Sequence, residues 1–172
     1  MDLKNNVTNQ IVFNLLGAGI ILIVQISCEA PQVINQPIAF NHSIHVNEVG
    51  LECTECHTGV ENRARATLPT VEICETCHSE MNGETEAEAF VVAAVENSEE
   101  IIWNRVYKLP DHVYFSHRRH ITLGKIECTQ CHGDIQDFET PPLSPQVALT
   151  MEFCMDCHEE HKVNNDCLAC HR

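Results

Sequence analysis

Hydrophobic residues are concentrated in two stretches of the chain, and the rest shows no long period. The first stretch is Ile11–Ser27, a predominantly apolar run behind a short polar start that contains Lys4. A helix over this run would be about 25 Å long, close to the shortest span of a bilayer. Residues 1–28 are therefore predicted to be an export signal or a membrane anchor, and residues 29–172 to form the folded domain.

The second stretch, Glu84–Asn97, has the pattern of an amphipathic helix. Its apolar positions are Ala87, Phe90, Val91, Ala94 and Val95. Glutamates gather at its start, where the helix dipole favours negative charge. The apolar residues that follow it, Ile101, Ile102 and Trp103, are expected to pack the helix against the second half of the domain. The remaining pattern predicts short helical turns joined by loops, a mainly α chain with little or no β-sheet.

Cysteine and histidine change this picture, because ten of the eleven cysteines fall into five copies of Cys-x-x-Cys-His. The first cysteines of the copies are Cys53, Cys74, Cys128, Cys154 and Cys167, and the second cysteines are Cys56, Cys77, Cys131, Cys157 and Cys170. The histidines of the copies are His57, His78, His132, His158 and His171. This spacing attaches haem c: the two thiols bond to one porphyrin, and the histidine reaches the iron as its proximal ligand. A zinc site or a disulfide scaffold would not need a histidine after every second cysteine.

Five covalently bound haems c are therefore expected, and they would supply most of the buried apolar surface. The chain has only six Phe, two Tyr and one Trp, and the motifs interrupt it from Cys53 onward. A core built from its side chains alone would be thin. We expect a core that is dominated by haem.

Residues 40–57 and 115–132 align without gaps and reveal an internal repeat. Each contains Phe-x-His-x-x-His ahead of its motif, and each is followed by a second motif. The organisation predicts two dihaem units, about 40–78 and 115–158, with a fifth haem at 167–171. The repeated histidines are predicted to be distal ligands of four irons, and they are His42, His45, His117 and His120.

Three residues compete for the distal position of the fifth iron. His161 is the first choice, and Met151 is its rival because a thioether also binds haem iron. His112 is the third candidate, with a surface or propionate-contacting role as its alternative. Six histidines outside the motifs are available for five positions, which predicts bis-histidine ligation throughout.

The formal net charge of −15 excludes a nucleic-acid partner, because phosphate binding needs a basic face. Cys28 follows the apolar run directly, in the position of the lipidated cysteine of a bacterial lipoprotein. An uncleaved helical anchor and a fully released protein are the alternatives. With either anchor, the haem domain would lie on the periplasmic side of a bacterial cytoplasmic membrane.

Phe-x-His-x-x-His followed by Cys-x-x-Cys-His resembles the class III multihaem cytochromes c. Residues 37–79, 102–121 and 149–158 are similar to the pentahaem subunit of alternative complex III and related quinol-oxidising complexes. The resemblance implies a multihaem cytochrome c fold beside iron–sulfur and polytopic quinol-binding subunits. It also implies electron flow from menaquinol toward another cytochrome or an oxidase.

Three functions are compatible with these features. The first is an electron-transfer subunit of a membrane quinone-linked complex, without a substrate site of its own, and the second is a free-standing periplasmic electron shuttle. The third is a multihaem reductase, which needs one iron with an open position. The surplus of histidines and the absence of a Cys-x-x-Cys-Lys variant argue against the reductase.

Overall fold

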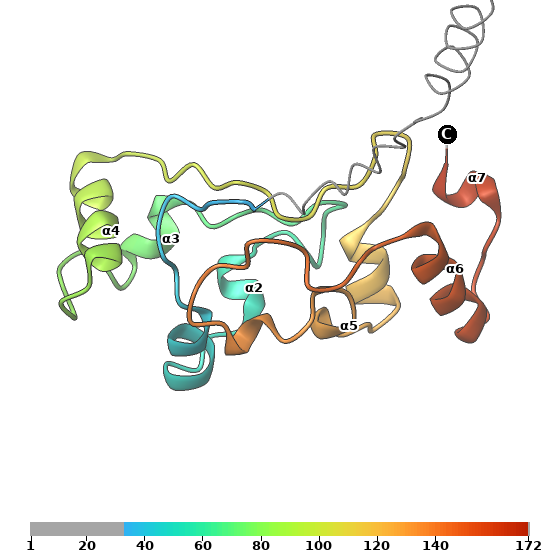
Figure 1. Ribbon diagram of the computed structural model, residues 1–172, viewed down its shortest axis with the longest axis horizontal. Helices are drawn as coiled ribbons and strands as arrows, with labels where there is room; N and C mark the ends of the chain where they lie inside the picture. Colours follow the sequence, from blue (N-terminus) through green and yellow to red (C-terminus); the bar gives the residue numbers. More distant parts are fainter. Residues whose placement is uncertain (1–32, 172) are drawn as a thin grey trace, which may run out of the picture. The chain divides into compact units, whose positions relative to one another are not determined.

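A computed structural model describes residues 33–171, which belong to a single unit, Gln32–Arg172. The α-helices are α2 (Cys53–Cys56), α3 (Val71–Glu75), α4 (Glu86–Asn97), α5 (Cys128–His132), α6 (Met151–Glu160) and α7 (Cys167–Cys170) (Figure 1). The shorter turns are η1 (Ile44–Glu48), η2 (Arg119–Leu123) and η3 (Ile135–Asp137). None of the helices in this part of the chain is long and apolar enough to cross a bilayer. The predicted signal or anchor at residues 1–28, including Cys28, lies outside the described residues.

Long loops connect the helices. The backbone pairing that resembles a sheet within residues 33–171 is one isolated antiparallel bridge, between Val113 and His171. The expected mainly α architecture with little or no β-sheet is confirmed.

A small hydrophobic cluster lies around α3 and α4. Its buried members are Ile38, Val71, Val91, Ala94 and Ile101. Helix α4 begins two residues later than predicted, because the Thr85 hydroxyl caps it by accepting a hydrogen bond from the Glu88 N–H. It ends at Asn97, and the φ of 54° at the capping residue Ser98 turns the chain out of the helix.

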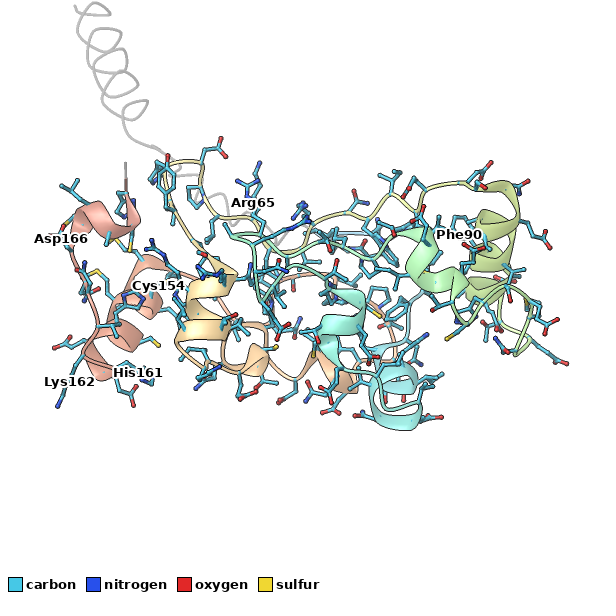
Figure 2. All side chains as sticks on the ribbon, turned by 180° about the vertical axis from the view of Figure 1, so that it is seen from behind. Arg65, Phe90, Cys154, His161, Lys162 and Asp166 are labelled. Carbon is cyan, nitrogen blue, oxygen red and sulfur yellow. The ribbon has the colours of Figure 1, made fainter. Side chains whose placement is uncertain are left out.

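The apolar face of α4 differs from the predicted one at two positions. Phe90 is 47% exposed, whereas Val92 is buried. These two residues flank Val91 by about 100° on either side of the helix axis. The packed face extends toward Val92, so Phe90 is left at the surface (Figure 2).

The residues that follow α4 pack on the first half of the domain, so the expectation that they would contact the second half is wrong. Ile101 is 4% exposed and joins the cluster with Val71 of α3. Trp103 packs against the same cluster, and its Nε1 donates a hydrogen bond to the Pro69 carbonyl at 2.8 Å. Ile102, between them, is 73% exposed. The indole N–H needs an acceptor when it is partly buried, and Pro69 supplies one.

The sequence repeat is also a repeat of backbone structure. The turns η1 and η2 occupy equivalent positions, and each is closed by an i→i+5 hydrogen bond of 2.9 Å, from Val49 N to Ile44 O and from Gly124 N to Arg119 O. Such π-helical turns are rare in proteins, and those that occur often lie at functional sites. Both turns carry the second histidine of Phe-x-His-x-x-His.

Candidate haem sites

Each motif folds as a turn of helix that places its two cysteines on one side. Positions i and i+3 of a helix are neighbours on its surface, so both thiols can reach one ligand. The histidine N–H closes the turn on the carbonyl of the first cysteine, at 2.9 Å for His57, 2.8 Å for His78 and 2.9 Å for His171. None of the ten motif cysteines forms a disulfide. The backbone therefore presents two thiols and an adjacent imidazole, as covalent attachment of haem c requires.

The Phe-x-His-x-x-His segments form two matching cradles of aromatic rings. In the first, Phe40 lies edge-on to His42 at 4.8 Å and stacked on His45 at 4.4 Å between ring centroids. In the second, the same contacts of Phe115 with His117 and His120 measure 4.9 and 4.5 Å. The phenylalanine of the repeat thus orients both histidines of its unit.

Three of the repeated histidines face the proximal histidine of a motif. The ring centroids are 6.1 Å apart for His45 and His78, 6.4 Å for His117 and His132, and 6.0 Å for His120 and His158. Metal–imidazole bonds are about 2 Å long, so two rings bound on opposite sides of one iron have their centres about 6 Å apart. The donor set and its spacing therefore fit bis-histidine haem.

His42 is the remaining repeated histidine. Burial, together with the nearby His57 and His45, lowers its pKa from 6.5 to about 4. Its Nδ1 is buried and has no hydrogen-bond partner among the described residues. A buried imidazole in this state is neutral, which is the form that can bind iron.

A fourth pair of rings involves His112 rather than His161. His112 stacks on His171 with 5.4 Å between ring centroids and 25° between ring planes. The backbone brings them together, because Val113 forms a bridge with His171 and the Tyr114 N–H donates to the Cys170 carbonyl at 2.8 Å.

The two residues that the sequence placed first for the fifth iron lie at the surface. His161 follows the last turn of α6 and is exposed (Figure 2), and Met151, at the start of α6, is 66% exposed. Within residues 33–171, no ring contact joins His161 to another histidine. The geometry favours His112 as partner of His171, and all axial assignments stay predictions.

Four of these histidines donate Nδ1–H to a backbone carbonyl, which fixes the ring and leaves Nε2 for iron. The carbonyl partners are Thr67 for His57, Asn164 for His158, Asn41 for His45 and Ser116 for His120, at 2.7 to 3.2 Å. The Nδ1 of His117 lies 3.2 Å from the Ala64 carbonyl and 3.3 Å from the Ala66 N–H. The Nδ1 of His78 meets the Glu88 carboxylate at 3.2 Å. The N–H groups of Asn82 and Gly83, together with His78, hold the pKa of Glu88 below its usual value.

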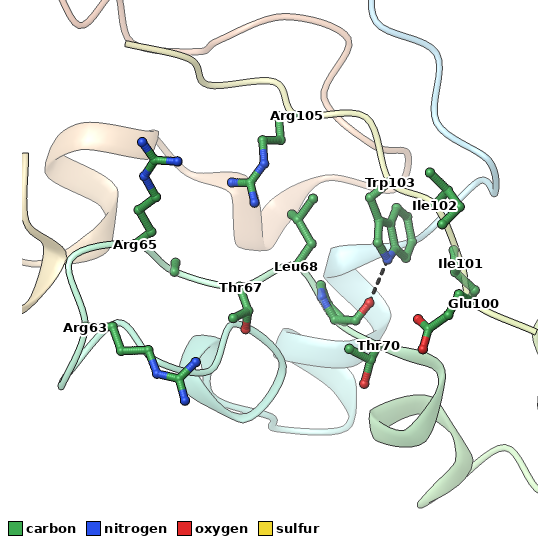
Figure 3. A pocket seen from close by; sticks show the side chains of 12 residues that line it. Arg63, Arg65, Thr67, Leu68, Thr70, Glu100, Ile101, Ile102, Trp103 and Arg105 are labelled. Carbon is green, nitrogen blue, oxygen red and sulfur yellow. Dashed lines mark hydrogen bonds between the residues drawn. The ribbon is translucent and has the colours of Figure 1, made fainter. Parts of the chain in front are cut away.

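A cavity of about 530 Å³ lies beside these sites but is separate from them (Figure 3). Arg63, Arg65 and Arg105 line it together with Trp103, and its lining includes no motif cysteine or histidine. Three arginines around one cavity are a local positive region in a chain of net charge −15.

The sequence matches known families over both halves. Residues 23–107 match the class III cytochrome C family, and residues 113–172 match cytochrome c7 and related cytochromes c. The multihaem cytochrome c subunit of a menaquinone reductase from Nitratidesulfovibrio vulgaris is 35% identical over 161 residues, which cover 80% of this chain and 77% of that subunit. The chain belongs to the class III family of multihaem cytochromes c.

The class III cytochrome assignment establishes haem c as cofactor and electron transfer as the activity. It confirms the multihaem cytochrome c fold that the motifs and the repeat predicted. Sequence reasoning missed Glu88 as the partner of His78, because Thr85-x-x-Glu88 reads as a helix-capping pattern. It also ranked His112 last, since only the long-range bridge at Val113 places that residue beside His171.

Proposed function

We propose that this cytochrome carries five haems c, one at each motif, and that every iron is bound by two histidines. The observation that carries the proposal is the set of facing histidine rings, each of which includes the proximal histidine of a motif. The proposed pairs are His42–His57, His45–His78, His117–His132, His120–His158 and His112–His171. The pair His42–His57 rests on the electrostatic proximity of the two rings and on the equivalence of His42 with His117.

Irons that have two histidine ligands each have no open coordination position, so the protein would pass electrons on without binding a substrate. Haem c supplies the electron chemistry when bound, and its potential depends on axial ligands, hydrogen bonding and burial. The residues of this chain hold the rings: carbonyls fix four imidazoles, and two phenylalanines orient the four repeated histidines. Bis-histidine ligation leaves no position for a substrate, which is why a relay is favoured over a reductase.

The fifth pair is tested by two matched variants of the purified, haem-loaded protein. His112→Ala is expected to convert one haem of five to the high-spin state and to open one site for carbon monoxide. His161→Ala is expected to leave all five haems low-spin, because its ring is exposed and contacts no other histidine of the described part. High-spin haem in His161→Ala with none in His112→Ala would restore the ranking made from the sequence. The intact mass of the protein counts the haems independently.

We further propose that the relay works within a membrane-bound complex that exchanges electrons with menaquinone, on the periplasmic side. The similarity to the menaquinone reductase subunit supports a quinone-linked role. Iron–sulfur and quinol-binding subunits are the proposed partners, and a lipid at Cys28 or an N-terminal helix is the proposed anchor. Mild detergent extraction of native membranes should recover the haem protein with these partners, whereas recovery of a solitary protein in a salt wash would favour a free-standing shuttle.

Alternative complex III is the second candidate for the complex. Residues 37–79, 102–121 and 149–158 resemble its pentahaem subunit, whereas the similar protein from Nitratidesulfovibrio vulgaris is named for menaquinone reduction. The two complexes differ in the direction of electron flow. Reduction of the haems by added menaquinol in the purified complex would favour alternative complex III, and reduction of menaquinone by the pre-reduced haems would favour a menaquinone reductase.

A further inference from the structure

The five attachment motifs lie next to one another in space in an order that differs from their order along the chain. Four contacts, one between each pair of neighbouring motifs, define this order. Haems are numbered below by the position of their motif in the sequence, from haem 1 at His57 to haem 5 at His171.

Haems 1 and 2 are joined by the first aromatic cradle. His42 and His45 lie three residues apart against the same phenylalanine, and the structure pairs them with different motifs. The second cradle joins haems 3 and 4 in the same way, because His117 faces His132 and His120 faces His158. Each cradle therefore makes neighbours of the two motifs of its own unit.

The link between the two units runs through haem 1. The loop after the first motif makes hydrogen bonds on both sides. The Thr67 carbonyl accepts from His57 Nδ1 at 3.2 Å, and His117 Nδ1 lies 3.3 Å from the Ala66 N–H and 3.2 Å from the Ala64 carbonyl. The same loop accepts the backbone N–H groups of His117 and Arg118. We call residues 63–67 the strap. It holds the proximal ligand of haem 1 and the distal ligand of haem 3 in one short segment.

Further contacts support this link. Cys53 of the first motif is close enough to Cys128 of the third to raise, after burial, the pKa of its thiol. Asn47 of η1 donates to the Gln136 carbonyl and to the Asp137 carboxylate of η3, which follows the third motif, at 3.1 Å each. Haem 2 lies away from this junction, because α3 packs on α4 and because His78, the proximal histidine of haem 2, bonds to Glu88.

Haem 5 extends the row beyond haem 4. His158 Nδ1 donates to the Asn164 carbonyl at 2.8 Å, and Asn165 donates to the Met155 carbonyl of α6 at 3.3 Å. These residues immediately precede α7, whose N-cap is Asp166. In Figure 1, α2 and α5 lie between α3 on one side and α6 on the other, and α7 lies beside α6.

We infer that the haems form a single row in the order 2–1–3–4–5, with haem 2 and haem 5 at its ends. Electrons that pass between the two units therefore pass from haem 1 to haem 3, at the strap. Partners that donate or accept electrons meet the row at haem 2, beside α4, or at haem 5, beside α7. The inference rests on the proposed occupancy of all five motifs, which the intact mass tests separately.

Two matched variants of the full haem-loaded chain distinguish this order from the sequence order 1–2–3–4–5. A methionine ligand raises the potential of its haem, so that haem is reduced first and, as low-spin ferrous iron, carries no spin. Electron paramagnetic resonance of samples poised at one electron per protein then shows whether a ferric haem has lost its only magnetic neighbour. His42→Met silences haem 1, and His45→Met silences haem 2.

The inferred order predicts a narrow signal from one uncoupled ferric haem in His42→Met, because haem 2 then stands alone. It predicts no such signal in His45→Met, because the four remaining haems stay in contact. The narrow signal in His45→Met alone, or the same spectrum in both variants, would overturn the order. A density map of the unaltered protein gives a second test: the iron of the first motif should lie between those of the second and third, and an iron of the second motif next to that of the third would refute it.

Discussion

The two repeat units share the arrangement of their predicted haem ligands but differ in what supports it. The aromatic contacts of Phe40 and Phe115 agree within 0.1 Å, from 4.8 to 4.9 Å and from 4.4 to 4.5 Å. The buried side chains of residues 33–171, however, all lie in or beside the first unit, and they are Ile38, Val71, Val91, Val92, Ala94 and Ile101. The second unit has no buried side chain within the described residues. Ligand placement and protein core are therefore separable features of this fold.

The difference shows what each part of the chain is for. The repeated segment is local, because its phenylalanine, its histidines and its π-helical turn lie within ten residues of sequence. The insertion of α4 between the units adds the apolar residues that the motifs lack, and it adds a carboxylate for His78. In the second unit, the proposed haems would lie against loops and would have to provide the packing themselves.

Removal of a haem from each unit is the strongest test of this difference. Cys154→Ser with Cys157→Ser removes haem 4 from the unit without a protein core. The opening free energy of α6 is expected to fall to about zero, because no buried side chain of the described part remains to hold that helix. Hydrogen exchange resolved by peptide mass measures this opening.

The matched variant is Cys74→Ser with Cys77→Ser, which removes haem 2 from the first unit. Helix α4 is expected to keep most of its protection, because Val91, Ala94 and Ile101 still pack together. Equal loss of protection in both variants would show that the cluster around α3 and α4 is too small to fold without haem.

Shortening one side chain of the hydrophobic cluster around α3 and α4 tests the same difference between the two units with less damage to the fold. Ile101→Ala is expected to lower the free energy of unfolding of the first unit by about 2–5 kcal/mol, since the side chain is 4% exposed. Its neighbour provides the control: Ile102→Ala, at 73% exposure, is expected to change stability by no more than about 0.5 kcal/mol. Denaturant titration followed by exchange of α4 amides reports both. Equal losses of stability at the two positions would contradict the observation that Ile101 packs in the cluster and Ile102 does not.

The motifs and the candidate ligands could be found from the sequence, whereas the residues that support them could not. Cys-x-x-Cys-His and Phe-x-His-x-x-His are short patterns whose chemistry requires that spacing, so they need no tertiary information. His112 meets His171 only because residues far apart in sequence form the bridge at Val113. The role of Glu88 likewise depends on the return of the chain from His78 through Asn82 and Gly83. Local patterns identify ligands, but long-range contacts decide their partners.

The carboxylate partner of His78 sets haem 2 apart from haem 4, whose His158 bonds to a carbonyl. An ionised carboxylate on Nδ1–H makes the imidazole a stronger donor and favours ferric iron. Glu88→Gln is therefore expected to raise the potential of haem 2 by about 60 mV, the equivalent of a tenfold change for one electron. Glu86→Gln removes the same charge from the same helical turn without a contact to His78. Potentiometric titration should show the shift in potential for Glu88→Gln. An equal shift for Glu86→Gln would mean that the lost negative charge, and not the contact with His78, changes the potential.

The smallest difference concerns the equivalent histidines His42 and His117. Burial lowers both pKa values, to about 4 for His42, whereas the Ala64 carbonyl opposes the shift at His117. Because the folded pKa of His42 lies below its ordinary 6.5, its neutral ring contributes stability above pH 6.5, and that contribution is lost as the pH falls toward 4. Protons compete with iron for each ring, so the ring with the lower pKa should stay bound to a lower pH.

Acidification of the haem-loaded protein should therefore convert haem 3 to the high-spin state at a higher pH than haem 1. Resonance Raman spectra at stepwise lower pH measure the conversion, and the His42→Met variant identifies the contribution of haem 1. Met does not titrate in this range, so the conversion step of haem 1 should disappear from that variant while the step of haem 3 remains. If the step at the higher pH is the one that disappears in His42→Met, that step belongs to haem 1. His117 would then stay bound to its iron to a lower pH than His42, and the prediction would be wrong.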